Sequence, residues 1–136
     1  MNASTHLAFG GNCSEAFHFY VKTLGCKLEM IMTYGDSPAA AQVEAAFKDK
    51  VIHASLNFGE TRITGADAPP DRFQKPQGFH VMLDIKEIAE VERVYAALAE
   101  GASITMPLQQ TFWAQRFAML TDRFGTPWML NCGNPA

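Results

Sequence analysis

The stretch Thr121-Asp122-Arg123-Phe124-Gly125-Thr126-Pro127-Trp128-Met129-Leu130-Asn131, near the end of the chain, decides the fold. Asp122 and Gly125 are turn formers with apolar residues on both sides, so the stretch predicts two strands joined by a tight turn. Extended back to Gln110, this hairpin holds both tryptophans of the chain. Aromatic-rich strands with a few polar groups suit either the wall of a small-molecule pocket or the protein core.

The residues before the hairpin predict a strand, a helix and a further strand. Apolar and polar side chains alternate over residues 78–85, which is typical of a strand with one buried face. Apolar residues at helical spacing predict a helix over residues 87–99, and Gly101 ends it. A short strand over residues 103–106 then leads into the hairpin.

The first half of the chain shows the same order of elements. A strand over residues 5–9 ends at Gly10, and a helix follows to about Leu24, with Asn12 and Glu15 predicted to form a capping box at its start. Between the later strands, residues 39–47 are predicted either as a helical turn or as a mobile flap over a site. The three strands that complete this half are predicted at residues 27–34, 51–58 and 61–65.

The two halves form an internal repeat, in which each half reads strand, helix and three strands. The sequence therefore predicts an α+β fold with two βαβββ modules, at about residues 1–67 and 78–136, joined by a linker at 68–77 within one domain of residues 1–136. We expect curved mixed sheets around a cavity, with the helices outside. Since each half exposes one apolar sheet face, the halves pack together or the chain forms a homodimer.

Composition narrows the classes of partner. The chain has 136 residues, a net charge of −3 and no block of like charges, which argues against nucleic acid and membrane as partners. No signal peptide is evident at the start of the chain. The three cysteines, Cys13, Cys26 and Cys132, form neither a disulfide framework nor a zinc motif, so we expect free thiols in a reducing cytoplasm.

Several stretches together carry a family resemblance. They are Gly11-Asn12-Cys13-Ser14-Glu15-Ala16-Phe17, Tyr34-Gly35-Asp36, His53-Ala54, the run from Met106 to Ala114, and the hairpin strand from Thr121 to Asn131. With the doubled βαβββ order, the chain resembles the vicinal oxygen chelate superfamily, which includes glyoxalase I, ring-cleaving dioxygenases and bleomycin- and fosfomycin-resistance proteins. Within it, the chain is most similar to the PhnB-like group.

The resemblance implies a divalent metal, because enzymes of this superfamily hold zinc, nickel, iron or manganese with His, Gln and Glu ligands. The four expected ligand positions fall on Thr5, Ile63, His80 and Met129. His6, next to Thr5, is expected on the opposite face of its strand, and a shift of one residue in this assignment would exchange the two. His80 is thus the only expected ligand present, and Met129 stands where the family pattern has an acid. His53 is a candidate second ligand, together with a carboxylate such as Asp67 or Glu60. The alternative is that His53 and His80 are hydrogen-bonded cavity histidines.

The remaining candidates are groups suited to acid–base chemistry or to contact with a ligand. The candidate catalytic residues are His53, His80 and Asp67; Asp67 has the alternative role of a turn former before Ala68. The aromatic and polar candidates for ligand binding are Phe9, Tyr34, Phe112, Trp113, Arg116, Trp128 and Asn131. Some of these aromatic residues must instead belong to the core.

Two functions follow from these observations. One is a metal-dependent, glyoxalase-like enzyme that acts on a small oxygenated molecule, with His80 and His53 as ligands or acid–base groups. The other is a metal-free protein that binds and sequesters a small molecule, as bleomycin-resistance members do, and Met129 favours it. Methyltransferase activity, a label often attached to the PhnB-like group, is disfavoured, because the chain lacks the Gly-rich turn that binds an adenosyl cofactor.

Overall fold

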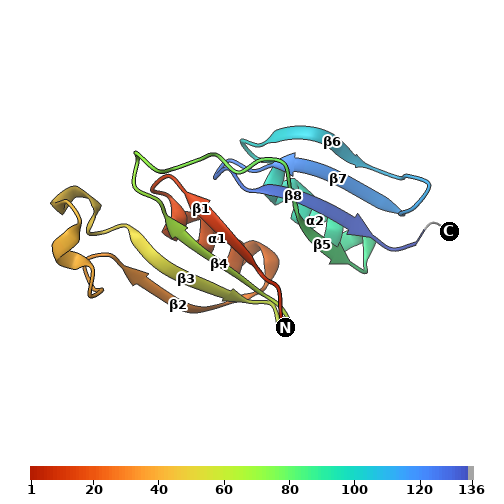
Figure 1. Cartoon of the computed structure of the whole chain (residues 1–136). Helices are drawn as coiled ribbons and strands as arrows, with labels where there is room; N and C mark the ends of the chain where they lie inside the picture. Colours follow the sequence, from red (N-terminus) through yellow and green to blue (C-terminus); the bar gives the residue numbers. More distant parts are fainter. Residues whose placement is uncertain (135–136) are drawn as a thin grey trace. The chain divides into compact units, whose positions relative to one another are not determined.

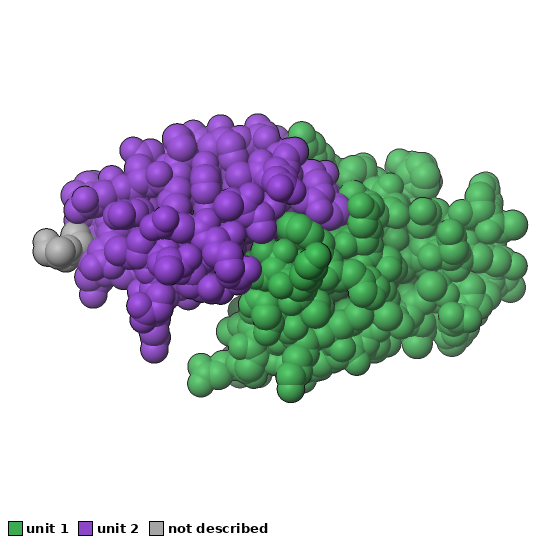
Figure 2. Space-filling model, turned by 180° about the vertical axis from the view of Figure 1, so that it is seen from behind, with its two compact units in different colours: residues 1–75 green, residues 76–136 purple. Residues whose placement is uncertain are grey.

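The computed structural model describes residues 1–134 and divides the chain into two compact units. Unit 1 runs from Met1 to Lys75, and unit 2 begins at Pro76 (Figure 2). The boundary lies inside the predicted linker, whereas the prediction of one domain over residues 1–136 remains a prediction. The last two residues of the predicted second module lie outside the described part of the chain.

Unit 1 is one βαβββ module (Figure 1). Its sheet has the strand order β1-β4-β3-β2, in which β1 and β4 are parallel and the other neighbours are antiparallel. Two short 3₁₀ turns, η1 and η2, occupy the ambiguous segment before β3. The elements are β1 (Thr5–Phe9), α1 (Cys13–Leu24), β2 (Lys27–Thr33), η1 (Ala40–Gln42), η2 (Ala45–Phe47), β3 (Val51–Asn57) and β4 (Arg62–Asp67).

Unit 2 repeats this topology, with the strand order β5-β8-β7-β6 and a parallel β5–β8 pair. The predicted α+β fold of two βαβββ modules is confirmed. The closing hairpin forms as predicted, but its first strand begins at Arg116 rather than near Gln110. The elements are β5 (Val81–Ile85), α2 (Ile88–Ala99), β6 (Ser103–Gln109), β7 (Arg116–Thr121) and β8 (Pro127–Cys132).

In each unit the helix covers one face of the sheet, because the apolar stripe of the helix and alternate apolar strand residues bury each other (Figure 1). The fully buried side chains of unit 1 include Leu7, Phe9, Phe17, Tyr20 and Leu56. Those of unit 2 include Val91, Leu98, Leu120, Trp128 and Leu130. No helix among the described residues is long and apolar enough to span a membrane.

The start of α1 is held by Asp67, which corrects the predicted capping box. Asn12 occupies the N-cap position but makes no side-chain cap hydrogen bond. Instead, the backbone N–H groups of Gly11 and Cys13 each donate to Asp67 Oδ1, both at 3.0 Å. The N–H of Val51, at the start of β3, donates to Asp67 Oδ2 at 2.9 Å. One carboxylate at the end of β4 therefore fastens the β1–α1 turn and the first residue of β3.

Asp122 holds the turn of the closing hairpin in unit 2, so its predicted role as a turn residue is confirmed. Its Oδ1 accepts hydrogen bonds from the backbone N–H groups of Phe124 and Thr126, at 2.9 and 3.0 Å. Its Oδ2 accepts one from Trp128 Nε1 at 2.8 Å. The carboxylate is buried and satisfied by these donors, which ties the turn to the largest core side chain of the unit.

Gly65 lets the aromatic core of unit 1 approach the sheet. A Cβ atom added at Gly65 would lie 2.6 Å from Phe17 Cζ and 2.9 Å from Phe17 Cε1. The Phe17 ring is fully buried and packs edge-to-face on Phe9, with 5.8 Å between ring centroids, so it has little room to move. The glycine in β4 is thus required by close packing of α1 and not by backbone conformation.

We predict that Asp67→Asn destabilises unit 1 by about 2–3 kcal/mol, because one buried backbone N–H then faces an amide N–H instead of a carboxylate oxygen. The measurement is the midpoint of urea unfolding. Asp49→Asn, at an exposed aspartate of the same unit, is the matched control and should leave the midpoint unchanged. Equal midpoints for the wild type and Asp67→Asn would show that the carboxylate does not hold the unit together.

We also predict that Gly65→Ala destabilises the protein by about 1–3 kcal/mol through overpacking against Phe17. The same substitution should cost less in a Phe17→Leu background, because the smaller side chain leaves room for the added methyl group. A double-mutant cycle of unfolding free energies measures this coupling. Additive effects of the two substitutions would contradict the packing argument.

Candidate functional site

Each sheet has a second face that its own helix does not cover, which we call the open face. Every second residue of a strand points its side chain to this face. Residues that pair directly on neighbouring strands lie side by side on it. Each open face is built from the four strands of its own unit.

The open face of unit 1 carries a polar group around His6. His6 in β1 pairs with Thr64 in β4, which pairs with Ser55 in β3. The ring Nδ1 of His6 and Thr64 Oγ1 share a hydrogen bond of 2.7 Å. Burial lowers the pKa of His6, and the nearby imidazole of His53 lowers it further. His53 therefore lies close enough to His6 to disfavour protonation of the His6 ring.

The open face of unit 2 carries a row of four methionines, one from each strand. Met82 in β5 pairs with Met129 in β8, Met129 pairs with Met119 in β7, and Met119 pairs with Met106 in β6. Met82 is 52% exposed, and the other three are half-buried. We call these four residues the methionine row. It is a continuous strip of thioether side chains across the whole sheet.

The two modules place different side chains at equivalent positions. In the parallel ladder of unit 1, the second of five residue pairs is His6–Thr64. In the parallel ladder of unit 2, the second pair is Met82–Met129. The ligand positions expected in the first half, Thr5 and Ile63, are therefore displaced by one residue. Both side chains lie on the helix-facing side of the sheet, together with buried Leu7.

These positions offer one imidazole, one hydroxyl and two thioethers, which is a poor ligand set for zinc, nickel, iron or manganese. Among residues 1–134, no group of three or more His, Cys, Asp or Glu side chains is arranged to hold a metal ion. The donor set within either unit thus does not fit the divalent metal that the family resemblance implies.

The predicted catalytic residues are divided between the two units, with Asp67 and His53 in unit 1 and His80 in unit 2. Asp67 is 1% exposed and its oxygens accept the three backbone N–H bonds described above, so it has a structural role that the sequence did not reveal. His53 is half-buried in β3, close to His6 rather than to a carboxylate partner. His80 is half-buried and directly precedes β5 in the other unit. Glu60 is exposed in the turn before β4. Their catalytic or metal-binding roles remain predictions.

Two of the predicted ligand-binding aromatics lie in the cores. Phe9 is 1% exposed and packs on Phe17 beneath the sheet of unit 1. Trp128 has no exposed surface, and its indole nitrogen is bonded to Asp122. Arg116 pairs with buried Cys132 and donates to the carbonyl oxygen of Gln115, so it shares the helix-facing side of β7. None of these three side chains belongs to the open face of its own unit.

Three other predicted ligand-binding residues gather beside the methionine row. Asn131 lies two residues after Met129 in β8, and it pairs with Phe117 in β7. The Phe117 ring packs edge-to-face on Trp113 at 5.1 Å between centroids, and Trp113 packs on Phe112 at 4.7 Å. Trp113 is 41% exposed and Phe112 87%. An aromatic ladder therefore runs from the open face of unit 2 to solvent.

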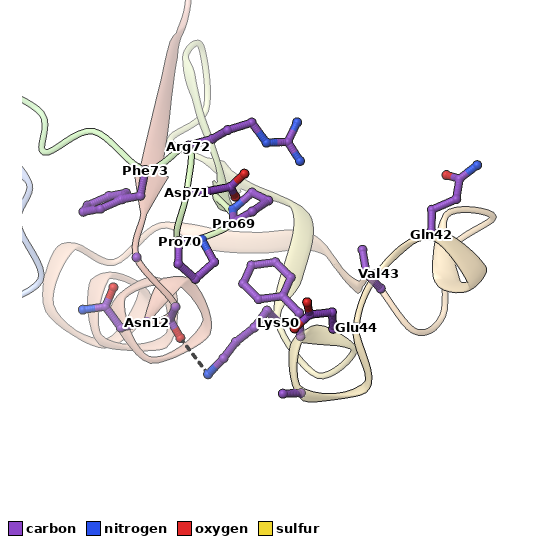
Figure 3. Close-up of a pocket in the computed structure, with 14 residues that line it drawn as sticks. Asn12, Gln42, Val43, Glu44, Lys50, Pro69, Pro70, Asp71, Arg72 and Phe73 are labelled. Carbon is purple, nitrogen blue, oxygen red and sulfur yellow. Dashed lines mark hydrogen bonds between the residues drawn. The ribbon is translucent and has the colours of Figure 1, made fainter.

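Unit 1 contains a separate hollow of about 1030 Å³, which we call the unit 1 pocket (Figure 3). Three segments surround it: the β1–α1 turn, the loop that contains η1 and η2, and the chain after β4. Its lining includes Lys50, Arg72, Phe47, Phe73 and the two prolines that follow Ala68. The predicted ligand-binding residue Tyr34 stands behind it, with its ring 4.9 Å from that of Phe47.

Tyr34 ties the loop of the unit 1 pocket to the sheet. Its hydroxyl donates to the backbone oxygen of Asp67 at 2.8 Å, and its backbone N–H donates to the Lys50 carbonyl at 2.9 Å. Burial and the Asp67 carboxylate raise the pKa of Tyr34, while the positive charge of Arg72 opposes them. The phenol therefore acts here as a neutral hydrogen-bond donor.

The three cysteines are free and buried, so the prediction of free thiols is confirmed. Cys13 lies at the start of α1, where the helix dipole favours a thiolate. Burial and the neighbouring Asp67 carboxylate instead raise its pKa far above the usual value, so the thiol stays protonated. Nothing in its surroundings activates it as a nucleophile.

Sequence patterns missed three features of these sites: the methionine row beyond Met129, the His6–Thr64 pair, and the pocket around Lys50. The row had a signal in the sequence, because Met82, Met119 and Met129 all fall on the side of their strands opposite to the most apolar residues. Their alignment into one row needs the register between strands, which the sequence alone does not supply.

Comparison with known proteins agrees with the fold and the repeat. The model of the Glyoxalase/Bleomycin resistance protein/Dioxygenase superfamily matches residues 4–130. Protein YjdN of Escherichia coli (strain K12) is 37% identical over 139 residues, which cover 96% of this chain and 95% of YjdN. The crystal structure of protein PA1353 from Pseudomonas aeruginosa is 42% identical, covers 99% of each chain and superposes with a TM-score of 0.90.

A further solved structure extends the likeness to the PhnB group. It is the PhnB protein from Bacillus cereus, named as a putative 3-demethylubiquinone-9 3-methyltransferase, with 23% identity, a TM-score of 0.81 and coverage of 98% of this chain and 100% of that one. At this identity the likeness shows a shared fold and not a shared activity. The match over residues 4–130 and the identity to YjdN show that the chain belongs to the glyoxalase/bleomycin resistance protein/dioxygenase superfamily.

Proposed function

We propose that this chain is a small-molecule binding protein of the superfamily, which takes an apolar, aromatic ligand on the open face of unit 2 without a divalent metal. The observation that carries the proposal is the methionine row. Thioethers are flexible and polarisable, and they make favourable contacts with aromatic rings. A strip of them suits ligands of varied shape, whereas a metal-dependent member needs a carboxylate or an imidazole at these positions.

The surroundings of the row support this ligand class. Phe117 lies one step along the open face from Met119 and Met129, and although it is itself buried, the exposed Trp113 ring packs on it. On the same face, Asn131 Nδ2 donates to Asp84 Oδ1 at 3.3 Å. A ligand ring on the methionines would therefore have aromatic neighbours on one side and an amide–carboxylate pair to orient a polar substituent.

The second candidate function is a metal-dependent enzyme on a small oxygenated molecule, and the His6–His53 pair favours it. Two imidazoles on one open face are suitable ligands for zinc or nickel, and a lowered pKa keeps His6 neutral, as a metal ligand must be. The pair has no carboxylate among the hydrogen-bond partners described for it, and its neighbour Thr64 offers only a hydroxyl. We therefore rank this function second.

A homodimer and a cytoplasmic location remain predictions from the sequence. An open face rich in thioethers and aromatic rings is the kind of surface that another chain can also cover. The same apolar face could thus bind a small molecule or a second copy of the chain. The thioether groups of the methionine row favour the small molecule.

We predict that Met129→Glu lowers the affinity for the neutral fluorescent probe N-phenyl-1-naphthylamine by at least about tenfold, because an ionised carboxylate in the row must be desolvated under the apolar ring. A fluorescence titration measures this. Met30→Glu is the matched control, since Met30 is 39% exposed on the open face of unit 1. Unchanged affinity in Met129→Glu would overturn the proposal. Stoichiometric zinc, nickel, iron or manganese in untagged protein, lost on His6→Ala, would support the enzyme instead.

We predict that the two tryptophans separate binding from folding. Trp113→Ala should lower probe affinity about tenfold with little change in thermal midpoint, because Trp113 is 41% exposed beside the row. Trp128→Phe should lower the thermal midpoint and leave probe affinity unchanged, because it removes the buried bond to Asp122. Equal losses of stability and binding in Trp113→Ala would place that side chain in the core and not at a ligand.

A further inference from the structure

The unit 1 pocket has the size and the walls of a ligand site, and it is distinct from the open face of unit 2. Its volume of about 1030 Å³ lies just above the usual range for small-molecule pockets. All of its lining residues belong to unit 1, and His6, His53 and Thr64 are not among them. A ligand bound in it would therefore use neither the methionine row nor the histidine pair.

The walls of the pocket are anchored to the core of the unit. Tyr34 joins its η2 loop to β4 through the hydrogen bond to the Asp67 backbone oxygen and through the ring contact with Phe47. On the other side, the Phe73 backbone N–H donates to the Pro69 carbonyl at 3.0 Å. The Phe73 ring lies over Gly10, where an added Cβ would be 3.3 Å from it. The site is thus largely formed before any ligand arrives.

Lys50 supplies a positive charge on the pocket floor. In Figure 3 its side chain extends beneath Pro70 toward Asn12, and its ammonium donates to the Gly11 carbonyl at 3.2 Å. An ammonium has three donors, and this bond uses one of them. The backbone N–H groups of Gly11 and Cys13 are committed to Asp67, so these two donors do not supply the anion contact. Lys50 is the half-buried cation among the lining residues, and its remaining donors can make this contact.

The other charges at the pocket narrow the ligand class. Arg72 contributes a second cation, and the carboxylates of Glu44 and Asp71 stand at the exposed rim. Two cations against two anions leave no net positive charge, which disfavours a polyanion such as a nucleotide triphosphate. One anionic group that reaches half-buried Lys50 still gains a charge-assisted hydrogen bond.

From this combination of features, we propose that the unit 1 pocket binds an aromatic monoanion. Its carboxylate or sulfonate group accepts a hydrogen bond from the Lys50 ammonium, and its ring packs between Phe47 and the prolines Pro69 and Pro70. Tyr34 positions this site without touching the ligand, since it holds the Phe47 ring from behind.

Two probes that differ by one charge test this proposal. The anion 8-anilinonaphthalene-1-sulfonate carries the ring system of neutral N-phenyl-1-naphthylamine plus a sulfonate. Lys50→Met keeps the apolar stem and removes the charge, so it should weaken sulfonate binding about tenfold and leave binding of the neutral probe unchanged. Lys48→Met, at an exposed lysine outside the pocket lining, is the matched control. Chemical shifts of the Gly11 amide on addition of the sulfonate give the location independently.

The outcomes separate this proposal from the proposed function. Loss of sulfonate binding in Lys50→Met but not in Lys48→Met, with a Gly11 shift, supports the pocket. Equal binding in the two variants, or no Gly11 shift, overturns it. Should Lys50→Met fold poorly, Glu44→Gln is the second variant, and it should strengthen sulfonate binding. Failure of Met129→Glu to change neutral-probe binding would remove the proposed function and leave the unit 1 pocket standing.

Discussion

The fold of unit 1 depends on one buried carboxylate. Asp67 ends β4, and its two oxygens accept hydrogen bonds from three backbone N–H groups in two other segments. Its own carbonyl accepts a fourth bond from Tyr34. Without the carboxylate, the β1–α1 turn and the start of β3 would each need another partner for a backbone donor. The unit 1 pocket is formed by these same segments, so its shape is set by the same interaction.

The two units show that one topology can be stabilised in two ways. In unit 1 the central carboxylate stands at the end of the parallel ladder and fastens a helix start. In unit 2 the central carboxylate is Asp122, which stands in the closing hairpin and fastens a tryptophan. The open faces of the two units also differ: that of unit 1 carries imidazole and hydroxyl groups, and that of unit 2 carries thioethers. The repeat therefore fixes where a site lies in each unit, and the side chains decide what it binds.

Local patterns predicted the elements well, because alternation and helical spacing are encoded over a few residues. The hairpin around Asp122, the helix that ends before Gly101 and the doubled βαβββ order all followed from such patterns. The cap of α1 could not be predicted in this way, because Asp67 lies 54 residues from Cys13 in the chain. Asp67 accepts the hydrogen bond at the helix start, and Asn12 makes no side-chain cap bond. A β-strand presents alternate residues to opposite faces, so a one-residue error assigned Thr5 instead of His6 to the site.

The parallel ladder between β1 and β4 also governs when unit 1 can form. His6 finds its partner Thr64 only across a separation of 58 residues. During synthesis, the first strand therefore has no neighbour in the sheet until the residues of β4 have left the ribosome. The β2–β3 hairpin and α1 can assemble earlier, since their contacts are closer in sequence. The sheet of each module is thus complete only when its last strand has been synthesised and can pair with its first. Because unit 1 comes first in the chain, its sheet can form before unit 2 has been synthesised.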